Sequence, residues 1–353
     1  MQPKRVGILG QGRYGTFLKT FFSKRGCEVR TSDIGTNPSN EEVTAWAEVI
    51  IVAVTLLETV KVIESIAPSL REDQLLVDIA STKAGSVDAM LKSPAEVLGL
   101  HPFCAPPVKR GTFKGQTMFV CRARVAGWGA WVDEFLASTE ATIEIVQPER
   151  HDLERTVDQV LEHMCTCLKV SVMRKLGLNA TKLFDVASPV YKLTSAQMAR
   201  MFSQSPDLYG GLALSNPFAS KTLAIFGEEF KRYSDFVKQG TLKPYVSDFL
   251  ANSVHLGPTN VRTLFLLSEQ LTSLMADLQE ANSMYITIPE DRPGILEEIA
   301  TMFRTASINL TVIHSRKLEG KTEFFIGFDR DREAPEVMTV RRRLKDELRA
   351  NLI

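Results

Sequence analysis

The stretch VGILGQGRYG, residues 6–15, decides the fold of this chain. Its apolar first half is typical of a buried strand, and the residues after it have the spacing of a helix. A G-x-G-x-x-G sequence between a strand and a helix indicates a dinucleotide-binding turn. We expect Gly10 to make the tight turn, Gly12 to let the backbone approach a pyrophosphate, and Gly15 to let the helix pack on the strand. Free N–H groups at the helix N-terminus then favour the phosphates.

An acidic residue follows this turn at the distance that such sites require. Asp33 ends the next apolar-alternating run, where a carboxylate meets the ribose hydroxyls. It favours NAD over NADP because it repels a 2′-phosphate, although Arg30 keeps NADP open. An ordinary glycine-rich turn without a ligand is the alternative. The predicted cofactor contacts are Gly10, Gln11, Gly12, Arg13, Tyr14, Gly15 and Asp33.

The composition is that of an ordinary globular protein, with 44% hydrophobic and 24% charged residues. Lys+Arg and Asp+Glu both total 42, so nothing points to nucleic acid or an anionic membrane as partner. The longest apolar run, residues 49–57, is too short to cross a bilayer, and no signal peptide precedes the first strand. The five cysteines have neither disulfide-framework nor metal spacing. We therefore expect a cytoplasmic protein with reduced thiols and no metal.

The pattern of strands and helices changes twice along the chain. Residues 1–147 alternate strands and helices, which predicts a doubly wound, Rossmann-type sheet that binds the dinucleotide. Residues 148–280 predict a helical domain for substrate binding and dimerisation, with His151-Asp152 near the start of its first long helix. Residues 281–353 follow the order β-α-β-β-α of a ferredoxin-like domain, whose fourth strand is expected to be missing or very short.

Two polar residues follow strands of the predicted sheet. Ser81 comes after the strand at residues 75–79, and His101 after the strand at residues 97–100. Ligands of doubly wound sheets bind at the carboxyl ends of the strands. Histidine, with an unperturbed pKa of ~6.5, can act there as a base at neutral pH. A histidine bonded to backbone and a serine that caps the next helix are the structural alternatives.

Four stretches, over about residues 5–255, resemble prephenate dehydrogenases. They are the glycine turn, VDIASTK at 77–83, LGLHPF at 98–103, and the run from ASPVYK through QMARMF to SPDLY at 187–209. The last run is similar to the family branch often fused to chorismate mutase, although the mutase portion is absent here. DRPGIL at 291–296 and INLTVIHSR at 308–316 resemble ACT domains.

The resemblance implies NAD-dependent oxidative decarboxylation of prephenate to 4-hydroxyphenylpyruvate, in tyrosine biosynthesis. It implies that His101 accepts the C4 hydroxyl proton while hydride passes from C4 to NAD, with Ser81 beside it. Arg200 would hold the ring carboxylate, so that His101 and Arg200 face opposite ends of one diacid. A solvent-exposed helix arginine is the alternative for Arg200.

Further substrate contacts are implied for Lys192, Gln159 and His163. Lys192 lies eight residues before Arg200 and can share its helix face, and Gln159 and His163 are i and i+4 on the long first helix. In the small domain the resemblance implies an aromatic amino-acid effector between paired domains, with a ligand-free dimerisation module as the alternative. The implied effector contacts are Pro293, Gly294, Ile295, Asn309, Leu310 and Ser315.

One departure from the family leaves the substrate open. Relatives tend to carry a glycine and an acid after His-Pro, where this chain has FCAPP at 103–107. Arogenate and 4-amino-4-deoxyprephenate therefore stay as alternative substrates. A non-catalytic regulator that binds NAD and an amino acid is the alternative from a different class. A β-hydroxyacid dehydrogenase is less consistent with the chain, because SPVYK is not the lysine-centred motif of those enzymes.

Overall fold

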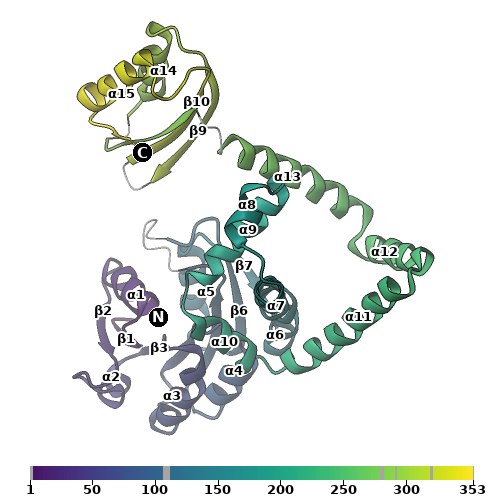
Figure 1. Cartoon of the computed structure of the whole chain (residues 1–353). Helices are drawn as coiled ribbons and strands as arrows, with labels where there is room; N and C mark the ends of the chain where they lie inside the picture. Colours follow the sequence, from purple (N-terminus) through teal and green to yellow (C-terminus); the bar gives the residue numbers. More distant parts are fainter. Residues whose placement is uncertain (1–2, 106–111, 279–281, 291, 319–320, 353) are drawn as a thin grey trace. The chain divides into compact units, whose positions relative to one another are not determined.

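The computed structural model describes residues 3–105, 112–278, 282–290, 292–318 and 321–352 (Figure 1). The chain divides into two compact units. The first comprises Met1–Leu178 and Ala199–Gly240, and the second comprises Asn179–Met198 and Thr241–Ile353. The three domains expected from the sequence stay a prediction beside this division.

A seven-stranded sheet forms the centre of the first unit, in the order β2-β1-β3-β4-β5-β6-β7. The β5–β6 pair is antiparallel and the other neighbours are parallel. This is the doubly wound sheet predicted from the alternating pattern, and its strand order reverses between β1 and β3. The strands are β1 (Arg5–Leu9), β2 (Glu28–Ser32), β3 (Val49–Val52), β4 (Leu75–Asp78), β5 (Glu96–Pro102), β6 (Thr117–Arg124) and β7 (Thr142–Ile145).

Helices cover both faces of this sheet, which is why its central strands are apolar throughout. In β3, Val49 and Ile51 belong to one buried cluster, and Ile50 and Val52 belong to another. Alternate side chains of a strand point to opposite faces, so the two clusters are the cores on the two sides of the sheet. The covering helices are α1 (Arg13–Ser23), α2 (Asn40–Trp46), η1 (Leu56–Glu58), α3 (Thr59–Ile66), η2 (Ala67–Ser69), α4 (Ala84–Leu91) and α5 (Gly129–Ser138).

The remaining helices of the first unit follow the sheet in the chain. The first long helix, expected to start near His151-Asp152, begins at Pro148, because proline suits the first helical position. It also contains a π-helical segment, η3 (Thr156–Leu161). The elements are α6 (Pro148–Arg155), η3, α7 (Glu162–Lys175), α10 (Pro206–Ser215) and α11 (Ala219–Gln239), and α9 (Pro189–Phe202) runs from the second unit into the first.

The second unit holds the helices α8 (Ala180–Asp185), α12 (Leu242–Leu256) and α13 (Pro258–Asp277), followed by a small α/β part. In that part an antiparallel sheet has the order β11-β8-β10-β9. The chain order is β-α-β-β-α-β, and the fourth strand is two residues long, so the expectation of a very short strand is confirmed. The elements are β8 (Ser283–Ile288), α14 (Ile295–Thr305), β9 (Leu310–Leu318), β10 (Lys321–Phe328), α15 (Pro335–Leu348) and β11 (Asn351–Leu352).

Part of the altered stretch after His101 cannot be compared with the structure, because Pro106 and Pro107 lie outside the described residues. None of the described helices combines the length and the apolar character that a membrane crossing requires.

Candidate active site

The glycine turn has two glycines that the fold needs and one that leaves space. Gly10 has φ +110°, and a Cβ there would lie 2.5 Å from the carbonyl oxygen of Ala53. A Cβ on Gly15 would lie 1.9 Å from the carbonyl oxygen of Gly10. A Cβ on Gly12, the N-cap of α1, would meet nothing within 4 Å. The space over Gly12 therefore fits a pyrophosphate at the N-terminus of α1.

Asp33 lies beside this turn, as the sequence predicted. Its Oδ2 accepts a hydrogen bond from the Gln11 amide at 2.7 Å, and its Oδ1 accepts one from the Ile34 amide at 2.8 Å. Arg30, the reason for keeping NADP open, pairs with Glu28 at 3.5 Å and lies 4.2 Å from the ring centre of Trp46. The Arg30 guanidinium is thus already engaged by an acid and an aromatic ring.

The turn also reaches the strand that carries His101. The hydroxyl of Tyr14, in the first turn of α1, donates to the carbonyl oxygen of Cys104, two residues beyond the end of β5. Burial raises the pKa of Tyr14, so this phenol stays protonated and keeps its donor. The nucleotide turn and the His101 strand end are therefore neighbours.

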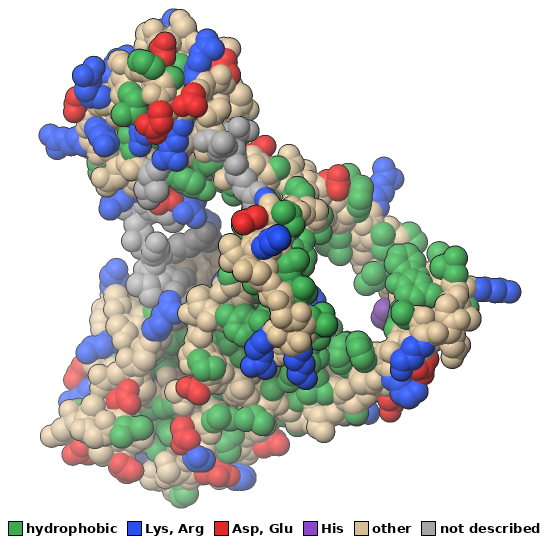
Figure 2. Space-filling model, viewed as in Figure 1, with side chains coloured by type: hydrophobic (Ala, Val, Ile, Leu, Met, Phe, Trp, Pro, Cys, Tyr) green, Lys and Arg blue, Asp and Glu red, His purple; other side chains and the backbone are tan. Residues whose placement is uncertain are grey.

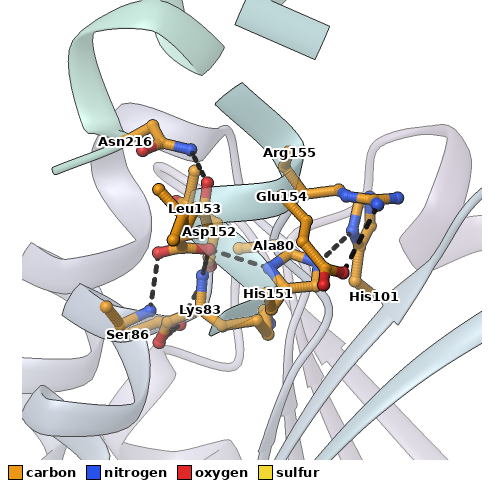
Figure 3. A network of polar contacts seen from close by, with 12 residues as sticks. Ala80, Lys83, Ser86, His101, His151, Asp152, Leu153, Glu154, Arg155 and Asn216 are labelled. Atoms are coloured by element: carbon orange, nitrogen blue, oxygen red, sulfur yellow. Dashed lines mark hydrogen bonds and ion pairs between the residues drawn. The ribbon is translucent and has the colours of Figure 1, made fainter. Parts of the chain in front are cut away.

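His101 is the first member of a buried hydrogen-bonded chain of three side chains (Figure 3). Its Nδ1 lies 2.9 Å from Nε2 of His151, and Nδ1 of His151 lies 2.8 Å from Oδ1 of Asp152. A carboxylate only accepts hydrogen bonds, so the Nδ1–H of His151 donates to Asp152. With both rings neutral, His151 Nε2 then accepts from the Nδ1–H of His101. This leaves the lone pair of His101 on Nε2.

Asp152 is held by the backbone at the start of α4. Its Oδ1 accepts from the Lys83 amide at 2.7 Å and its Oδ2 from the Ala84 amide at 2.8 Å. Asn216 also donates from Nδ2 to the Asp152 carbonyl at 2.8 Å. Asp152 therefore caps α4 from a distant segment, and the N-cap residue is Lys83. The alternative interpretation of Ser81 as the helix cap is wrong, and Ser81 lies half-buried between β4 and α4.

A buried ion pair supports the same strand ends. Lys83 Nζ lies 2.5 Å from Oδ2 of Asp78, at the end of β4, and both side chains are fully buried. The same ammonium donates to the carbonyl oxygen of Leu100 at 2.7 Å, next to His101. Burial raises the pKa of the Asp78 carboxyl, and the Lys83 ammonium opposes that rise. Lys83 therefore holds the ends of β4 and β5 together next to His101.

The surroundings keep His101 neutral. Burial lowers its pKa well below 6.5, and the neighbouring His151 and the positive charges of Lys83 and Arg155 lower it further. A neutral imidazole with a defined acceptor nitrogen is the form that a general base requires.

The other predicted substrate residues form a separate group. His163 lies edge-on to Tyr209, with ring centres 4.6 Å apart, and burial lowers the His163 pKa. Burial raises the pKa of Tyr209, and the nearby charge of Arg200 lowers it. The Arg200 side chain is exposed. Among the residues that the structure describes, no hydrogen bond or ring contact joins this group to His101.

Gln159 and Lys192 occupy different surroundings. Gln159 lies half-buried in the π-helical segment η3, so the i, i+4 spacing from Gln159 to His163 is not that of a regular α-helix. Lys192 belongs to the second unit, where its Nζ lies 5.6 Å from the ring centre of Phe184.

The predicted effector residues lie in the small α/β part. Gly294 has φ +87°, a conformation that favours glycine, and is the N-cap of α14. Ile295 is buried in the core, and Asn309 donates through its backbone amide and its Nδ2 to Asp329, at 3.0 and 2.8 Å. Leu310 begins β9. Pro293 and Ser315 are exposed.

The expectation of reduced thiols and no metal concerns the cysteines and the acids of the chain. All five cysteines are free thiols. Within the described ranges, no group of three or more His, Cys, Asp or Glu side chains could hold a metal ion.

Sequence reasoning missed Lys83, His151, Asp152 and Arg155 as members of this site. His151-Asp152 was expected only near a helix start, and the helix begins three residues before His151. An adjacent His-Asp pair has no spacing that marks it as functional. Lys83 ends VDIASTK, one of the stretches that resemble the family, and this stretch was the signal available for it.

The N-terminal part matches a known family. Residues 14–144 match the family model described as the nucleotide-binding domain of prephenate dehydrogenase. The chain is 28% identical over 248 residues to the T-protein of Enterobacter agglomerans, covering 69% of this chain and 65% of that protein. It is 25% identical over 252 residues to a probable arogenate/prephenate dehydrogenase of Methanocaldococcus jannaschii, covering 70% of this chain and 56% of that protein. The chain thus spans 56–65% of the length of these two relatives.

A solved structure shares the fold. It is the prephenate dehydrogenase of A. aeolicus in complex with hydroxyphenyl propionate and NAD+, with a TM-score of 0.57 and 13% identity, covering 72% of this chain and 99% of that one. At this identity the likeness concerns the fold.

Proposed function

We propose that this chain, whose nucleotide-binding domain is that of the prephenate dehydrogenase family, catalyses the NAD-dependent oxidative decarboxylation of prephenate to 4-hydroxyphenylpyruvate. The observation that carries the proposal is the buried chain Asp152–His151–His101 beside the glycine turn. This arrangement resembles a dehydrogenase site because it places an oriented base next to a dinucleotide-binding turn.

The residues present fit NAD. The open space over Gly12 suits the pyrophosphate, and the Asp33 carboxylate suits the ribose hydroxyls. NAD, when bound, supplies the acceptor for the hydride from C4 of the substrate.

His101 carries the proton through the reaction. The hydroxyl proton at C4 goes to Nε2 of His101 as the C4–H bond breaks with both of its electrons, so that C4 becomes a carbonyl carbon. The electrons of the C1–carboxylate bond then enter the ring as CO2 leaves. His101 returns the proton to the oxygen, which becomes the phenol, and the reaction balances without a net proton.

Asp152 and His151 keep His101 ready for this task. The backbone amides at the start of α4 fix the Asp152 carboxylate, and the carboxylate fixes the His151 tautomer. Ser81, at the end of β4, is proposed as a second contact of the C4 hydroxyl.

Arg200 is proposed to hold the ring carboxylate, because a guanidinium fork binds a carboxylate with two hydrogen bonds. Its charge acts on the neighbouring Tyr209, which supports that assignment, although its exposed side chain also fits the alternative of a solvent-exposed helix arginine. Gln159, His163 and Lys192 are proposed as further substrate contacts.

Two other parts of the proposal concern regulation and assembly. An aromatic amino acid, tyrosine or phenylalanine, is proposed to bind near Gly294 and Ser315 and to regulate the enzyme. The chain is proposed to work as a homodimer. Arogenate or 4-amino-4-deoxyprephenate are the alternative substrates, and a non-catalytic regulator that binds NAD and an amino acid is the alternative of a different class.

An NADH absorbance assay with prephenate, arogenate and 4-amino-4-deoxyprephenate, each with NAD+ and NADP+, tests the activity. We expect NADH formation to be fastest with prephenate and NAD+. Because the His101 pKa lies well below 6.5, kcat/KM should remain near its plateau at pH 6.5 and fall only in more acidic buffer. Added tyrosine or phenylalanine tests the regulatory part.

His101→Asn should lower kcat by about 10²–10⁴-fold, the usual contribution of a general base, with the NAD+ dissociation constant unchanged. Near-normal turnover of this variant would remove His101 from the mechanism. A wild-type chain that forms no NADH with any of the three compounds would favour the non-catalytic regulator.

A further inference from the structure

Arg155 is a nearly buried cation that the reaction as described does not use. It ends α6, one turn after His151, and its side chain is 12% exposed. Its Nε is buried and has no hydrogen-bond partner within the described part of the chain. An unsatisfied buried donor on a charged group costs free energy, so a ligand atom that accepts from it would be favoured.

Arg155 and His101 lie against the same two aromatic rings. The guanidinium carbon of Arg155 is 4.5 Å from the ring centre of Phe119 and 5.1 Å from that of Phe103. The His101 ring centre is 6.0 Å from Phe119 and 5.4 Å from Phe103. In the view of Figure 3 the Arg155 guanidinium overlaps the His101 ring, and the charge of Arg155 lowers the His101 pKa. The two groups are therefore neighbours at the end of β5.

Within the described part of the chain, two acids pair with the Arg155 guanidinium. Nη1 of Arg155 lies 3.0 Å from Asp158, and Nη2 lies 3.9 Å from Glu154. On the other side, His101 lies near His151 and the ammonium of Lys83. His151 is hydrogen-bonded to Asp152, and Lys83 forms an ion pair with Asp78. The two acids of Arg155 lie on its own helical segment and engage the Nη atoms, so that Nε is left without a partner among the residues that the structure describes.

We propose that Arg155 is a specificity-determining residue whose Nε–H donates to the oxygen at C4 of the substrate, and that it selects a hydroxyl over an amino group there. This rests on the proposed function. An oxygen at C4 accepts a hydrogen bond throughout the reaction and carries negative charge as CO2 leaves, when a donor stabilises it most. An ammonium at C4 has no lone pair to accept that bond, and the guanidinium charge repels it.

The experiment compares Arg155→Gln with the wild type in the NADH assay, using prephenate and 4-amino-4-deoxyprephenate. Loss of one oriented donor to a developing oxyanion typically costs about 10²–10³-fold in rate. We expect kcat/KM for prephenate to fall by about 10²-fold and the preference for prephenate over the amino compound to fall by at least tenfold. The acidic limb of kcat/KM against pH should move to higher pH, because the cation near His101 is gone.

The Arg155→Lys variant distinguishes the effect of the positive charge from the effect of the Nε–H hydrogen bond. It should keep the acidic limb near its wild-type position because the charge stays, but should not restore kcat/KM, because the Nε–H is lost. Arg150→Gln is the matched control, since Arg150 lies on the same helix, is 65% exposed and pairs with Glu154 at 2.6 Å. It should behave as the wild type.

Equal losses on both substrates with an unmoved pH limb would overturn the proposal, since they would show a purely structural arginine. An Arg155→Gln variant that matches Arg150→Gln would also overturn it, while a dead His101→Asn variant would leave the proposed function standing. Absence of NADH formation by the wild type with any of the ring compounds would instead overturn the proposed function, and the Arg155 proposal with it.

Discussion

At the scale of residues, His151 has partners that allow its neutral ring only one arrangement. Asp152 can only accept, so it takes the Nδ1–H, and Nε2 is left to accept from His101. Phe119 lies edge-on to the His151 ring, with ring centres 5.2 Å apart, and keeps it in place. The tautomer of His101 is therefore set by Asp152, whose carboxylate also caps α4.

His151→Phe keeps a ring against Phe119 but removes the acceptor for His101. The Nδ1–H of His101 then loses its partner, and the ring is free to turn its Nε2 away from the substrate. We expect kcat to fall by about 10²-fold, at the lower end of the range for general bases, with an unchanged NAD+ dissociation constant. Steady-state kinetics and NAD+ titration measure both. His255→Phe, at an exposed histidine of α12, serves as the control, and a His151→Phe enzyme as fast as this control would exclude the positioning role.

At the scale of elements, different glycines of the glycine turn are expected to affect the stability of the fold and the binding of NAD. Gly15 has no room for a Cβ because α1 packs against the backbone of Gly10 at this point. A Cβ on Gly12 would contact no protein atom, so a methyl group there would exclude only a bound ligand. Gly15 is therefore needed for packing, and Gly12 is available for a ligand. The G-x-G-x-x-G motif alone does not distinguish these two roles.

Gly15→Ala should destabilise the chain by about 1–3 kcal/mol or more, the usual cost of forcing extra atoms into a packed site. Gly12→Ala should lower stability by no more than about 1 kcal/mol, the cost of a poorer helix cap, but should weaken NAD+ binding at least tenfold. Thermal unfolding without cofactor and NAD+ titration by calorimetry distinguish the two. Wild-type NAD+ affinity in Gly12→Ala would mean that the pyrophosphate does not lie over this turn.

In the long helix from Pro148 to Lys175, the apolar periodicity of the sequence does not predict an irregular segment. The sequence predicts one regular helix here, and the structure contains the π-helical segment Thr156–Leu161. An extra residue in one turn shifts the faces of the helix before and after it, and such turns often occur at functional sites. Arg155 lies directly before this segment, and Gln159 lies in it.

At the scale of the whole molecule, α12 and α13 are apolar helices without a buried side chain. Figure 2 shows hydrophobic side chains gathered over both helices. Phe249, Leu250 and Val254 on α12 are 62%, 58% and 74% exposed, and Leu264 and Phe265 on α13 are both 59% exposed. An apolar surface of this kind usually marks a protein–protein interface, and a second copy of the chain is the proposed partner.

Light scattering after size-exclusion chromatography should therefore give about twice the 39.3 kDa of one chain. Leu250→Glu places a charge on the apolar surface and should shift the mass toward one chain, whereas Ser247→Glu, at an exposed polar position of α12, should leave the dimer intact. A wild-type protein that elutes at the mass of one chain would contradict the proposed assembly.

The sequence by itself determined the elements that depend on local patterns. The doubly wound sheet and the order of the helices follow from apolar periodicity and from glycines at turns. The missing or very short last strand was expected from the β-α-β-β-α order of the small domain. It also singled out His101 and Asp33, because both lie where a strand ends and the chain turns toward the ligand side of the sheet. These are short-range properties that a run of residues carries within itself.

Only the tertiary structure decided which side chains meet. Lys83 finds Asp78 and Leu100 from two strands, and Asp152 reaches the start of α4 from a segment far along the chain. Arg155 comes to lie beside His101 because both lie against Phe103 and Phe119. Such contacts depend on how the sheet packs against a helix that comes later in the chain. The spacing of residues along the sequence does not predict which side chains this packing brings together.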